Sequence, residues 1–556
     1  MTRAHGRTLS LALAQVNPTV GDIDGNLQRL REARAAAPAG CDLVITGELG
    51  LAGYPPEDLV LKRAFQGRVE TAVQSLATET ADGGPAILIG APWRSDSALH
   101  NAALLLDGGH IADVRLKYDL PNYGVFDEKR VFRPGPLPEP IDFRGARLGV
   151  MVCEDMWTPA VAGHLGQRGA ELLVVLNGSP FEVDKTEVRE DLAAKRCAET
   201  GLPLIYVNLV GGQDELVFDG ASFALTPEGT VSVRAPAWQA GVTPSRWQRR
   251  PQGLQCAAGD VAANVNGLES IYQAMTVGLR DYVGKNRFPG VIIGLSGGID
   301  SALSAAVAVD ALGCERVHCV MMPSPYTSSE SLEDAAEVAR LLGVHLDSVN
   351  IEPAMHAFSG MLDGLFEGRA ADTTEENIQA RSRGLVLMAI SNKLGYMVLT
   401  TGNKSEMSVG YATLYGDMCG GFSVLKDIYK TTVFALSRWR NQSCPDGGLG
   451  PRGRVMPERV ISKPPTAELK HNQTDQDSLP PYDELDGILA GLVEDESSIE
   501  DIVARGYDEP TVRRVWRMLD RAEYKRRQAP PGVKITRRAF GRDRRYPITN
   551  GFTSQI

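Results

Sequence analysis

Residues 291–313, VIIGLSGGIDSALSAAVAVDALG, place a glycine-containing break between an apolar run and an alanine-rich stretch with helical periodicity. The β-branched residues before the break predict a buried strand, and the glycines allow backbone N–H groups to turn toward a ligand at the start of the next helix. Such amides and the helix dipole together favour an anion, most often a phosphate. The alternative is an ordinary strand-to-helix turn, and the residues within the break distinguish between these two interpretations.

The break differs from the loop that binds phosphates in phosphoryl-transfer enzymes. That loop reads G-x-x-x-x-G-K-[ST] and carries a lysine that reaches the outer phosphates. Here no lysine is present, and the acidic residue Asp300 stands beside the predicted anion site. An acid is compatible with bound phosphates when a divalent cation bridges the two. The break therefore predicts ATP bound with Mg²⁺ and cleaved so that the loop keeps pyrophosphate, as in the adenylation of a carboxylate.

Predicted strands and helices alternate on both sides of an irregular stretch at about residues 235–266, which is rich in Pro, Gly, Gln and Ala and predicts a linker. The 556 residues suffice for two or more domains, because a single core rarely grows past about 250 to 300 residues. Before the stretch the pattern predicts a layered α/β sandwich, and after it a doubly wound parallel sheet whose ligands gather at the carboxyl ends of the strands. The candidate strands are LSLALAQ, DLVITGE, AILIGAP, AALLLD, ARLGVMVC, LLVVLNG and LPLIYVNLV, then VIIGLS, VHCVMMP, HLDSVNI and MVLTTGN.

Charge and cysteine content narrow the class of protein. A net charge of -11 and a pI near 5.4 argue against a general nucleic-acid binder, although residues 525–547 form a local basic patch. The eight cysteines include no C-x-x-C pair and resemble neither a zinc site nor a disulfide framework. No run of 18 apolar residues suggests a membrane span. We therefore expect a cytoplasmic protein without nucleic-acid or membrane partners.

Cys153 is the candidate nucleophile of the first half. It ends the predicted buried strand RLGVMVC, and the acidic, aromatic EDMW that follows suits a turn that exposes a sulfur. A nucleophilic thiol needs a base and a group that stabilises an oxyanion. Glu48 and Lys117, each at a predicted strand end, are candidates for these roles, whereas His164 offers no recognisable pairing. A cysteine that only fills the core is the alternative, because sequence spacing does not show that these residues meet.

Several motifs in fixed order resemble one family over nearly the whole chain. TGELGLAGYPPEDL, KYDLPNYGVFDEKRVF and GVMVCEDMW resemble the glutamine-hydrolysing domain of glutamine-dependent NAD(+) synthetases, a branch of the nitrilase superfamily. GLSGGIDS, EENIQARSRG, TTGNKSEMSVGYATLYGDMCGGF and ISKPPTAEL resemble their synthetase domain. The resemblance implies a nitrilase-like αββα sandwich over residues 1–240, a linker over 241–266, and a Rossmann-like ATP pyrophosphatase domain with a doubly wound parallel sheet over 267–556.

In the first half, the resemblance implies a complete glutaminase site. Cys153 would be the nucleophile, Glu48 the general base, and Lys117 the group that stabilises the tetrahedral intermediate. The ammonium group of Lys117 would also favour the thiolate of Cys153. Glu128 matches a second glutamate that many nitrilases place beside the lysine. The residues that would hold glutamine are Tyr123, Ser179 and Lys185.

In the second half, the resemblance implies sites for ATP, Mg²⁺ and deamido-NAD(+). Asp300 and Glu406 would bind Mg²⁺, and Glu406 would also face the second substrate. The residues expected at ATP are Gly294, Leu295, Ser296, Gly297, Gly298, Ile299, Asp300, Ser301 and Thr401. Those expected at deamido-NAD(+) are Asn377, Arg381, Glu406 and Lys525. Binding by Lys525 would explain the basic patch without nucleic acid.

The implied reaction is the glutamine-dependent amidation of deamido-NAD(+) through an acyl-adenylate. Its partners would be glutamine, ATP and deamido-NAD(+), its products NAD(+), AMP, pyrophosphate and glutamate, and ammonia would travel through the protein in a homo-oligomer. One alternative is another amidating ligase, such as one that makes GMP or asparagine, but these lack ENIQARSRG. Another is an amidase fused to a nucleotide-binding regulator, which the presence of Cys153, Asp300 and Glu406 disfavours.

Overall fold

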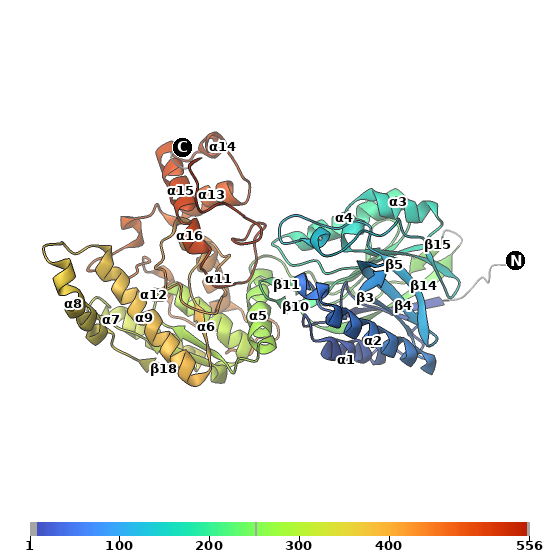
Figure 1. The fold of residues 1–556 in the computed structure, drawn as a ribbon, viewed down its shortest axis with the longest axis horizontal. Coiled ribbons are helices and arrows are strands. Elements are labelled where there is room, and N and C mark those ends of the chain that lie inside the picture. The colour runs from blue at the N-terminus through green and yellow to red at the C-terminus, as the bar shows by residue number, and fades with distance from the viewer. Residues whose placement is uncertain (1–7, 251–252, 553–556) are drawn as a thin grey trace. The chain divides into compact units, whose positions relative to one another are not determined.

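The computed structural model describes residues 8–250 and 253–552, and the chain divides into two compact units, Met1–Asn266 and Gly267–Ile556 (Figure 1). Each unit has its own sheets and its own apolar core. Across the described ranges, no helix combines the length and the apolar character that a membrane crossing requires.

The first unit contains two large sheets and one small ribbon. The seven-stranded sheet has the order β15-β14-β1-β2-β3-β4-β5, with β1 at Thr8–Gln15, β2 at Leu43–Ile45, β3 at Ala86–Ser95, β4 at Ala98–Asp107, β5 at His110–Leu116, β14 at Gly241–Arg250 and β15 at Gly253–Cys256. The six-stranded sheet has the order β13-β12-β9-β8-β7-β6, with β6 at Ile141–Phe143, β7 at Ala146–Val152, β8 at Leu172–Leu176, β9 at Leu204–Val207, β12 at Phe223–Leu225 and β13 at Val231–Arg234. The ribbon pairs β10 (Val210–Gln213) with β11 (Leu216–Asp219).

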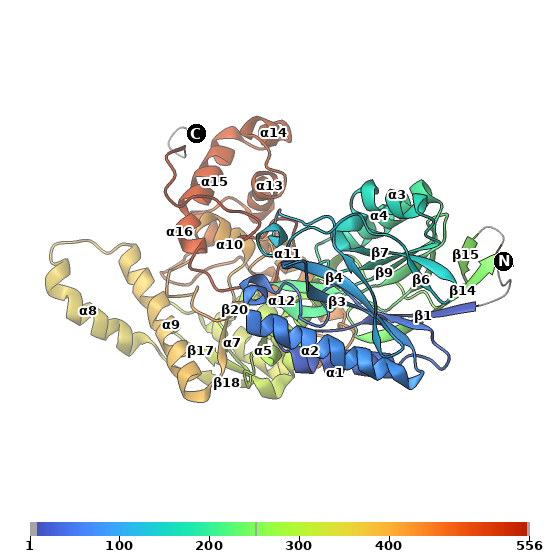
Figure 2. The same ribbon diagram turned by 45° about the vertical axis from the view of Figure 1, so that its right-hand side comes forward.

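These two sheets face each other and carry helices on their outer faces, as Figures 1 and 2 show. Between the sheets, Leu11 and Ile45 of the first pack in one core with Val150 and Val174 of the second. Helices α1 (Ile23–Ala35) and α2 (Arg63–Glu79) cover the first sheet, and α3 (Pro159–Gln167) and α4 (Lys185–Thr200) cover the second. The four layers confirm the predicted αββα sandwich.

The expected linker over residues 241–266 requires a correction. Strand β14 pairs antiparallel with β1 and with β15, so residues 241–250 and 253–256 belong to the first sheet. Trp247 is fully buried and lies in the core between the sheets, opposite Leu9. Because the strand is otherwise polar and contains proline, its composition resembles that of a loop. The division between the units falls at Asn266, the expected end of the linker.

The second unit is built on one parallel sheet of order β18-β17-β16-β19-β20. Its strands are β16 (Val291–Gly294), β17 (Val317–Met321), β18 (His345–Ser348), β19 (Met397–Thr400) and β20 (Phe422–Ser423). On one face, Ile292, Val320 and Val398 pack with Leu387 of α9 (Thr373–Leu394), which contacts α8 (Glu352–Phe366). The sheet also contacts α6 (Ile299–Leu312) and α7 (Ser329–Leu342), and α6 packs against α5 (Gly267–Lys285) and α11 (Lys430–Gln442). This arrangement confirms the predicted doubly wound sheet.

A helical cluster combines α10 (Lys404–Val409), which lies between β19 and β20 in the sequence, with helices that follow the sheet. Val409, Leu485, Ile502 and Val512 share one apolar core. The helices of this part are α10 (Lys404–Val409), α12 (Glu458–Ser462), α13 (Tyr482–Val493), α14 (Ile499–Ala504), α15 (Glu509–Arg521) and α16 (Glu523–Arg526).

Candidate active sites

In the first unit, the three predicted catalytic residues follow the ends of three strands. Glu48 follows β2, Lys117 follows β5 and Cys153 follows β7. Because β4 is antiparallel to both β3 and β5, β5 runs in the same direction as β2 and β3. The carboxyl ends of β2 and β5 therefore lie at one edge of the sheet, which brings Glu48 and Lys117 into contact.

Lys117 is the centre of a buried charged group, which we call the Lys117 trio (Lys117, Glu48 and Glu128). Its Nζ donates to Glu48 Oε1 at 2.7 Å and to both carboxylate oxygens of Glu128 at 2.9 Å. The side chains of Lys117 and Glu48 have no exposed surface. Burial alone would lower the pKa of Lys117, but the charges of Glu128 and Glu48 outweigh it and raise that pKa well above its usual range. The lysine is therefore a fixed positive charge.

Cys153 occupies a sharp turn between β7 and a short 3₁₀ helix, Cys153–Met156. Its φ of 47° lies in the left-handed region, which a residue with a side chain adopts at a cost. Burial and the charge of Glu48 raise the pKa of the thiol well above its usual value, although Lys117 acts to lower it. Lys117 thus favours the thiolate, as expected, but burial and the charge of Glu48 act more strongly in the opposite direction. The raised pKa favours the neutral thiol, which a base must deprotonate before it attacks.

Two buried polar residues that the sequence did not single out hold this site in place. Asp155 accepts hydrogen bonds from the backbone N–H groups of Tyr118, Asp119 and Val152 at 2.8 to 3.0 Å, so it joins the turn of Cys153 to the segment that follows Lys117. Asn101 donates from Nδ2 to Glu48 Oε1 at 2.7 Å. Asp155 lies within the motif GVMVCEDMW, so the sequence contained a signal that this residue belongs to the site. Asn101 lies inside β4, where an apolar run conceals it.

The three residues expected to hold glutamine differ in their surroundings. Tyr123 is about half exposed (54%), and its hydroxyl donates to the Glu154 carboxylate at 3.0 Å. Ser179 is buried, and its hydroxyl accepts a hydrogen bond from Nε of Arg189 at 3.1 Å. Lys185 begins α4 and pairs with Glu182 at 3.3 Å. Ser179 is thus held by Arg189, whereas Tyr123 has an accessible ring.

In the second unit, residues 294–301 form the predicted turn from β16 into α6. Gly297 has a φ of +80°, and a Cβ there would lie 2.2 Å from the backbone oxygen of Ser331. The Ser301 hydroxyl accepts from the Ser296 N–H at 3.2 Å and donates to the Gly298 carbonyl at 2.9 Å. Glycine is therefore required at position 297, and the serines fix the turn at the start of a 14-residue helix, the kind of terminus that binds anions.

Asp300 and Glu406 meet at Lys430, and we call these residues the Lys430 trio. Lys430 Nζ donates to Asp300 Oδ2 at 2.5 Å and to Glu406 Oε1 at 2.9 Å. Asn403 supports both acids, because its Nδ2 donates to Asp300 and its Oδ1 accepts from the Glu406 N–H, each at 2.9 Å. Burial and the charge of Asp300 raise the pKa of Glu406 to about 7, against the opposite effect of Lys430. No sequence pattern pointed to Lys430.

The two carboxylates of the Lys430 trio fit a bound Mg²⁺ ion. Their oxygens converge on one cationic group, the ammonium of Lys430. Without a positive charge at this position, the two carboxylates would repel each other. Hard carboxylate oxygens are also the ligands that Mg²⁺ prefers. The site therefore accommodates positive charge between Asp300 and Glu406.

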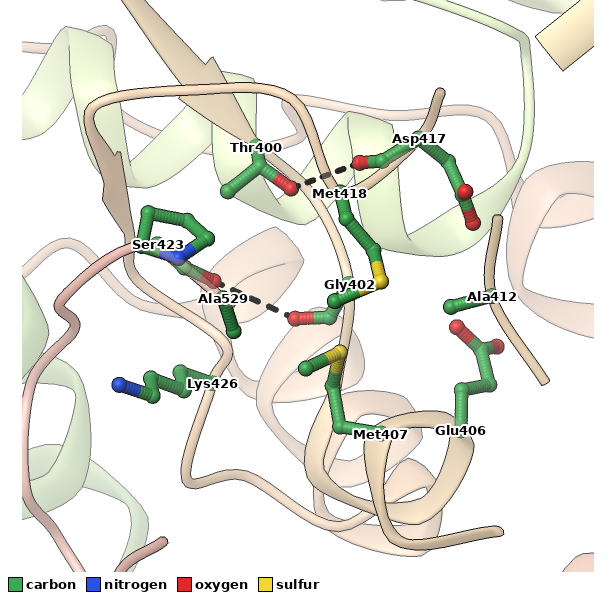
Figure 3. Close-up of a pocket in the computed structure, with 11 residues that line it drawn as sticks. Thr400, Gly402, Glu406, Met407, Ala412, Asp417, Met418, Ser423, Lys426 and Ala529 are labelled. Carbon is green, nitrogen blue, oxygen red and sulfur yellow. Dashed lines mark hydrogen bonds between the residues drawn. The ribbon is translucent and has the colours of Figure 1, made fainter. Parts of the chain in front are cut away.

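A cleft opens beside Glu406, and Figure 3 shows the residues that line it. Thr400 and Gly402, which flank Thr401, contribute to it from the carboxyl end of β19, and Asp417 and Ala412 contribute from the following segment. Strand β19 is the neighbour of β16, so this cleft and the turn at 294–301 share one edge of the sheet. The sequence predicted a ligand at this edge.

The remaining predicted residues surround this cleft more loosely. Lys525 donates from Nζ to the carbonyl oxygens of Ala412 and Gly410 at 2.6 and 2.7 Å. Burial lowers the pKa of Lys525 below its usual value. The charge of Asp417 opposes this shift and the charge of Arg381 adds to it, so both residues lie close enough to act on Lys525. Asn377 accepts from the Thr413 hydroxyl at 2.9 Å. The predicted residues at positions 377, 381 and 525 thus all contact the segment 410–417 or act on it electrostatically.

Comparison with known proteins matches both units. A carbon-nitrogen hydrolase family model matches residues 10–248, and an NAD synthase family model matches residues 271–529. A glutamine-dependent NAD(+) synthetase of Rhodobacter capsulatus is 50% identical, over 98% of this chain and 99% of that protein. One of Thermotoga maritima is 44% identical, over 99% of this chain and 100% of that protein.

A solved structure agrees along the whole length. The glutamine-dependent NAD+ synthetase of Acinetobacter baumannii in complex with adenosine diphosphate is 42% identical, covers 99% of this chain and 100% of its own, and superposes with a TM-score of 0.78. Both the sequence comparison and the fold therefore extend over both units and are not confined to one of them.

Proposed function

Because the chain belongs to the family of glutamine-dependent NAD(+) synthetases, we propose that it hydrolyses glutamine in its first unit and amidates deamido-NAD(+) with the released ammonia in its second unit. The observation that carries the proposal is the presence, in one chain, of a buried Lys117 trio beside Cys153 and of a glycine turn whose Asp300 converges with Glu406. The first arrangement suits nucleophilic attack on an amide. The second suits an ATP-dependent ligation.

In the first unit, Cys153 attacks the side-chain amide carbon of glutamine while its proton passes to Glu48. Glu48 then returns the proton to the leaving nitrogen, so ammonia departs and a thioester remains. Water, deprotonated by Glu48, attacks the thioester and releases glutamate, and the thiol regains a proton. The raised pKa of the Cys153 thiol supports this order of events, because a base is then needed before attack.

Lys117 supplies positive charge to the oxyanion of each tetrahedral intermediate. Its fixed charge and complete burial support this role, because an electrostatic interaction is stronger where water is excluded. Tyr123, Ser179 and Lys185 hold the glutamine in this proposal. The accessible ring of Tyr123 supports contact with a substrate, while Ser179 acts from a position that Arg189 fixes.

In the second unit, a carboxylate oxygen of the nicotinate ring attacks the α-phosphorus of ATP, and the bond to the β-phosphate breaks. The turn at 294–301 and Thr401 hold ATP, and the turn retains the departing pyrophosphate. Ammonia then attacks the acyl carbon, the bond from that carbon to the phosphate oxygen of AMP breaks, and the nitrogen loses a proton to water, which leaves the amide of NAD(+). Asn377, Arg381, Glu406 and Lys525 hold deamido-NAD(+), which the positions of these residues around the segment 410–417 support.

Asp300 and Glu406 are the residues that would hold Mg²⁺. When bound, the ion neutralises negative charge on the phosphates of ATP as pyrophosphate departs. The contribution of the chain is to keep the two acids close together, with Asn403 bonded to both. Lys430 stabilises the same pair when no substrate is present.

We further propose that ammonia passes from Cys153 to the adenylate inside the protein. Free ammonia at neutral pH is mostly protonated and unreactive, so release into water would waste it. Amide-¹⁵N glutamine, supplied together with excess unlabelled ammonium, tests this step. NAD(+) that carries mostly ¹⁵N supports internal transfer, whereas isotopic dilution to the ratio in solution contradicts it.

The assembly and compartment are also proposals. We expect a homo-oligomer, and exposed apolar side chains on α8 and α9 support it, namely Met361, Leu365, Leu385 and Leu394. The eight cysteines are free, which supports a reducing compartment such as the cytoplasm. Sedimentation analysis of the full chain tests the first expectation.

One assay tests the whole reaction. The protein is incubated with ATP, Mg²⁺, glutamine and deamido-NAD(+), and the products are separated. NAD(+), AMP, pyrophosphate and glutamate in equal amounts are expected. Glutamate without NAD(+) and AMP would instead identify an amidase with a nucleotide-binding partner unit.

A further inference from the structure

Two neighbouring strands of the second unit bring two histidines and an aspartate together. His318 on β17 and His345 on β18 are direct partners in the parallel register, and Asp347 follows two residues after His345. Residues two apart on a strand point to the same face, so the three side chains share one face of the sheet. His318 is half-buried, whereas His345 and Asp347 are exposed.

The three side chains converge on a small volume. Nε2 of His318 lies 2.8 Å from Asp347 Oδ2, and Nε2 of His345 lies 3.2 Å from Asp347 Oδ1. One ligand atom from each residue can be chosen so that all three lie within 4.8 Å of one another. Four ligands at about 2.0 to 2.1 Å around a tetrahedral ion are about 3.4 Å apart, so the present spacing needs only small side-chain rotations to enclose one.

We propose that His318, His345 and Asp347 form a binding site for a divalent transition-metal cation, with Zn²⁺ as the cation of choice. Imidazole nitrogen favours Zn²⁺, Cu²⁺ and Ni²⁺, while carboxylate and water oxygens favour Mg²⁺. Two imidazoles and one carboxylate supply three of the four ligands of a tetrahedral Zn²⁺ site, and water supplies the fourth. In the metal-free protein, the Nε2–H group of each imidazole donates to the Asp347 carboxylate. The bound cation replaces these two protons between the imidazoles and the carboxylate.

The site is separate from the proposed catalytic apparatus of the second unit. His318 and His345 stand at the amino-terminal ends of β17 and β18, whereas the turn at 294–301 follows the carboxyl end of β16. All three strands are parallel, so the two sites lie at opposite edges of the sheet. The ligand types differ in the same way, since Asp300 and Glu406 offer oxygen alone.

The position of the site predicts its effect. Strand β18 is an edge strand of four residues, and none of its side chains is fully buried. Few core contacts therefore hold it against β17. An ion bound by His318 on one strand and by His345 and Asp347 on the other joins the two directly, so it stabilises the edge of the sheet.

Metal titration of the full chain tests the proposal. The protein is stripped with a chelator, returned to buffer with excess Mg²⁺ and without substrates, and titrated with Zn²⁺ in a calorimeter. We expect His345→Ala and Asp347→Asn each to weaken one binding event by at least ~10-fold, because even loss of a residue that only supports a ligand costs about that much. Both residues are exposed, so these variants test the site even if His318→Ala fails to fold.

His356→Ala is the matched control. His356 is an exposed histidine on α8 that pairs with Glu352 at 3.5 Å, an ordinary helix-surface pair, and its removal should leave the titration unchanged. Co²⁺ gives a second readout, because a complex of nitrogen and oxygen ligands lacks the thiolate charge-transfer band of a cysteine site. Equal Zn²⁺ binding by the wild type, His345→Ala and Asp347→Asn would overturn the proposal and leave an ordinary hydrogen-bonded group. Wild-type Co²⁺ absorption with a thiolate band that persists in these variants, and no other band, would also overturn it.

Discussion

Each unit places one buried lysine between two carboxylates, but the two groups differ in exposure. In the Lys117 trio the side chains of the lysine and the two acids are 0%, 0% and 6% exposed. In the Lys430 trio the lysine is 2% exposed and the acids 19% and 18%. The same combination of charges is therefore closed in the first unit and partly open in the second.

The difference in exposure corresponds to different use of the positive charge. Charges that are removed from water must stay paired, because an unpaired buried charge is very costly. The Lys117 trio therefore keeps its lysine as a permanent part of the site. Both acids of the Lys430 trio are partly exposed and Glu406 lines a cleft, which would let a substrate and its cation reach the trio. The comparison predicts that the first trio is a fixed catalytic group and the second an exchangeable one.

The largest predicted effect is a loss of NAD(+) synthesis that depends on the nitrogen donor, glutamine or ammonium. We expect Cys153→Ala to lower glutamine-dependent NAD(+) formation by more than about 1000-fold, because the nucleophile is lost, while synthesis from added ammonium persists. Initial rates with each donor measure this. Cys197→Ala, which changes a buried cysteine of α4, is the control and should retain both activities. Equal loss with both donors in Cys153→Ala would assign the residue to the fold.

The next effect concerns the acids of the Lys430 trio. Asp300→Asn and Glu406→Gln should lower NAD(+) synthesis by roughly 100-fold or more with either donor, since both would lose a ligand for Mg²⁺. Rates with ammonium over a series of Mg²⁺ concentrations measure the loss and any shift toward higher Mg²⁺. Asp363→Asn on α8 serves as the exposed control. Normal rates with an unchanged Mg²⁺ dependence would remove both residues from the metal site.

Replacement of the two lysines tests the comparison directly. Lys117→Met leaves two enclosed carboxylates without a partner and should lower the free energy of unfolding by about 3 to 5 kcal/mol. Lys430→Met should cost less, because its partners are partly exposed, and Mg²⁺ should restore part of the loss. Calorimetric melting with and without Mg²⁺ measures both. Equal losses, or recovery of Lys117→Met with Mg²⁺, would show that the two groups do not differ as proposed.

The smallest predicted effect is a pH dependence of the first unit. Burial raises the pKa of Glu128 from 4.5 to about 7, even beside Lys117. The folded chain then holds the proton on Glu128 more tightly than the unfolded chain does. The resulting contribution to the free energy of unfolding is complete below about pH 4.5 and is lost as the pH rises through about 7. Glu128→Gln should remove about 1 to 3 kcal/mol of the fall in unfolding free energy over this window.

The measurement for Glu128 is the unfolding free energy at several pH values, with hydrogen exchange of β7 amides to assign the first unit. Glu70→Gln on the surface of α2 is the control and should follow the wild type. A Glu128→Gln profile parallel to that of the wild type would mean that Glu128 remains ionised across the window. Lys117 would then outweigh burial.

The sequence by itself determined the sheets and the turns that carry the chemistry. Apolar and β-branched runs such as residues 172–178 and 291–296 are local signals, because burial of a strand fixes the type of each of its residues. The motifs around Cys153 and Asp300 likewise identified strand ends before any contact was known. By contrast, the composition of β14 predicts part of a linker, because a polar strand with one buried Trp247 has no regular hydrophobic pattern.

Only the tertiary structure decided which charges meet and in which protonation state. Lys430 lies 130 residues from Asp300 in the sequence, so nothing local marks them as partners. Lys117 favours ionisation of the Cys153 thiol, but burial and the charge of Glu48, which no sequence pattern reveals, raise the pKa of that thiol. The physical reason is that desolvation and Coulomb energies depend on distances in space and on exclusion of water, whereas strand and turn preferences depend on the residues themselves.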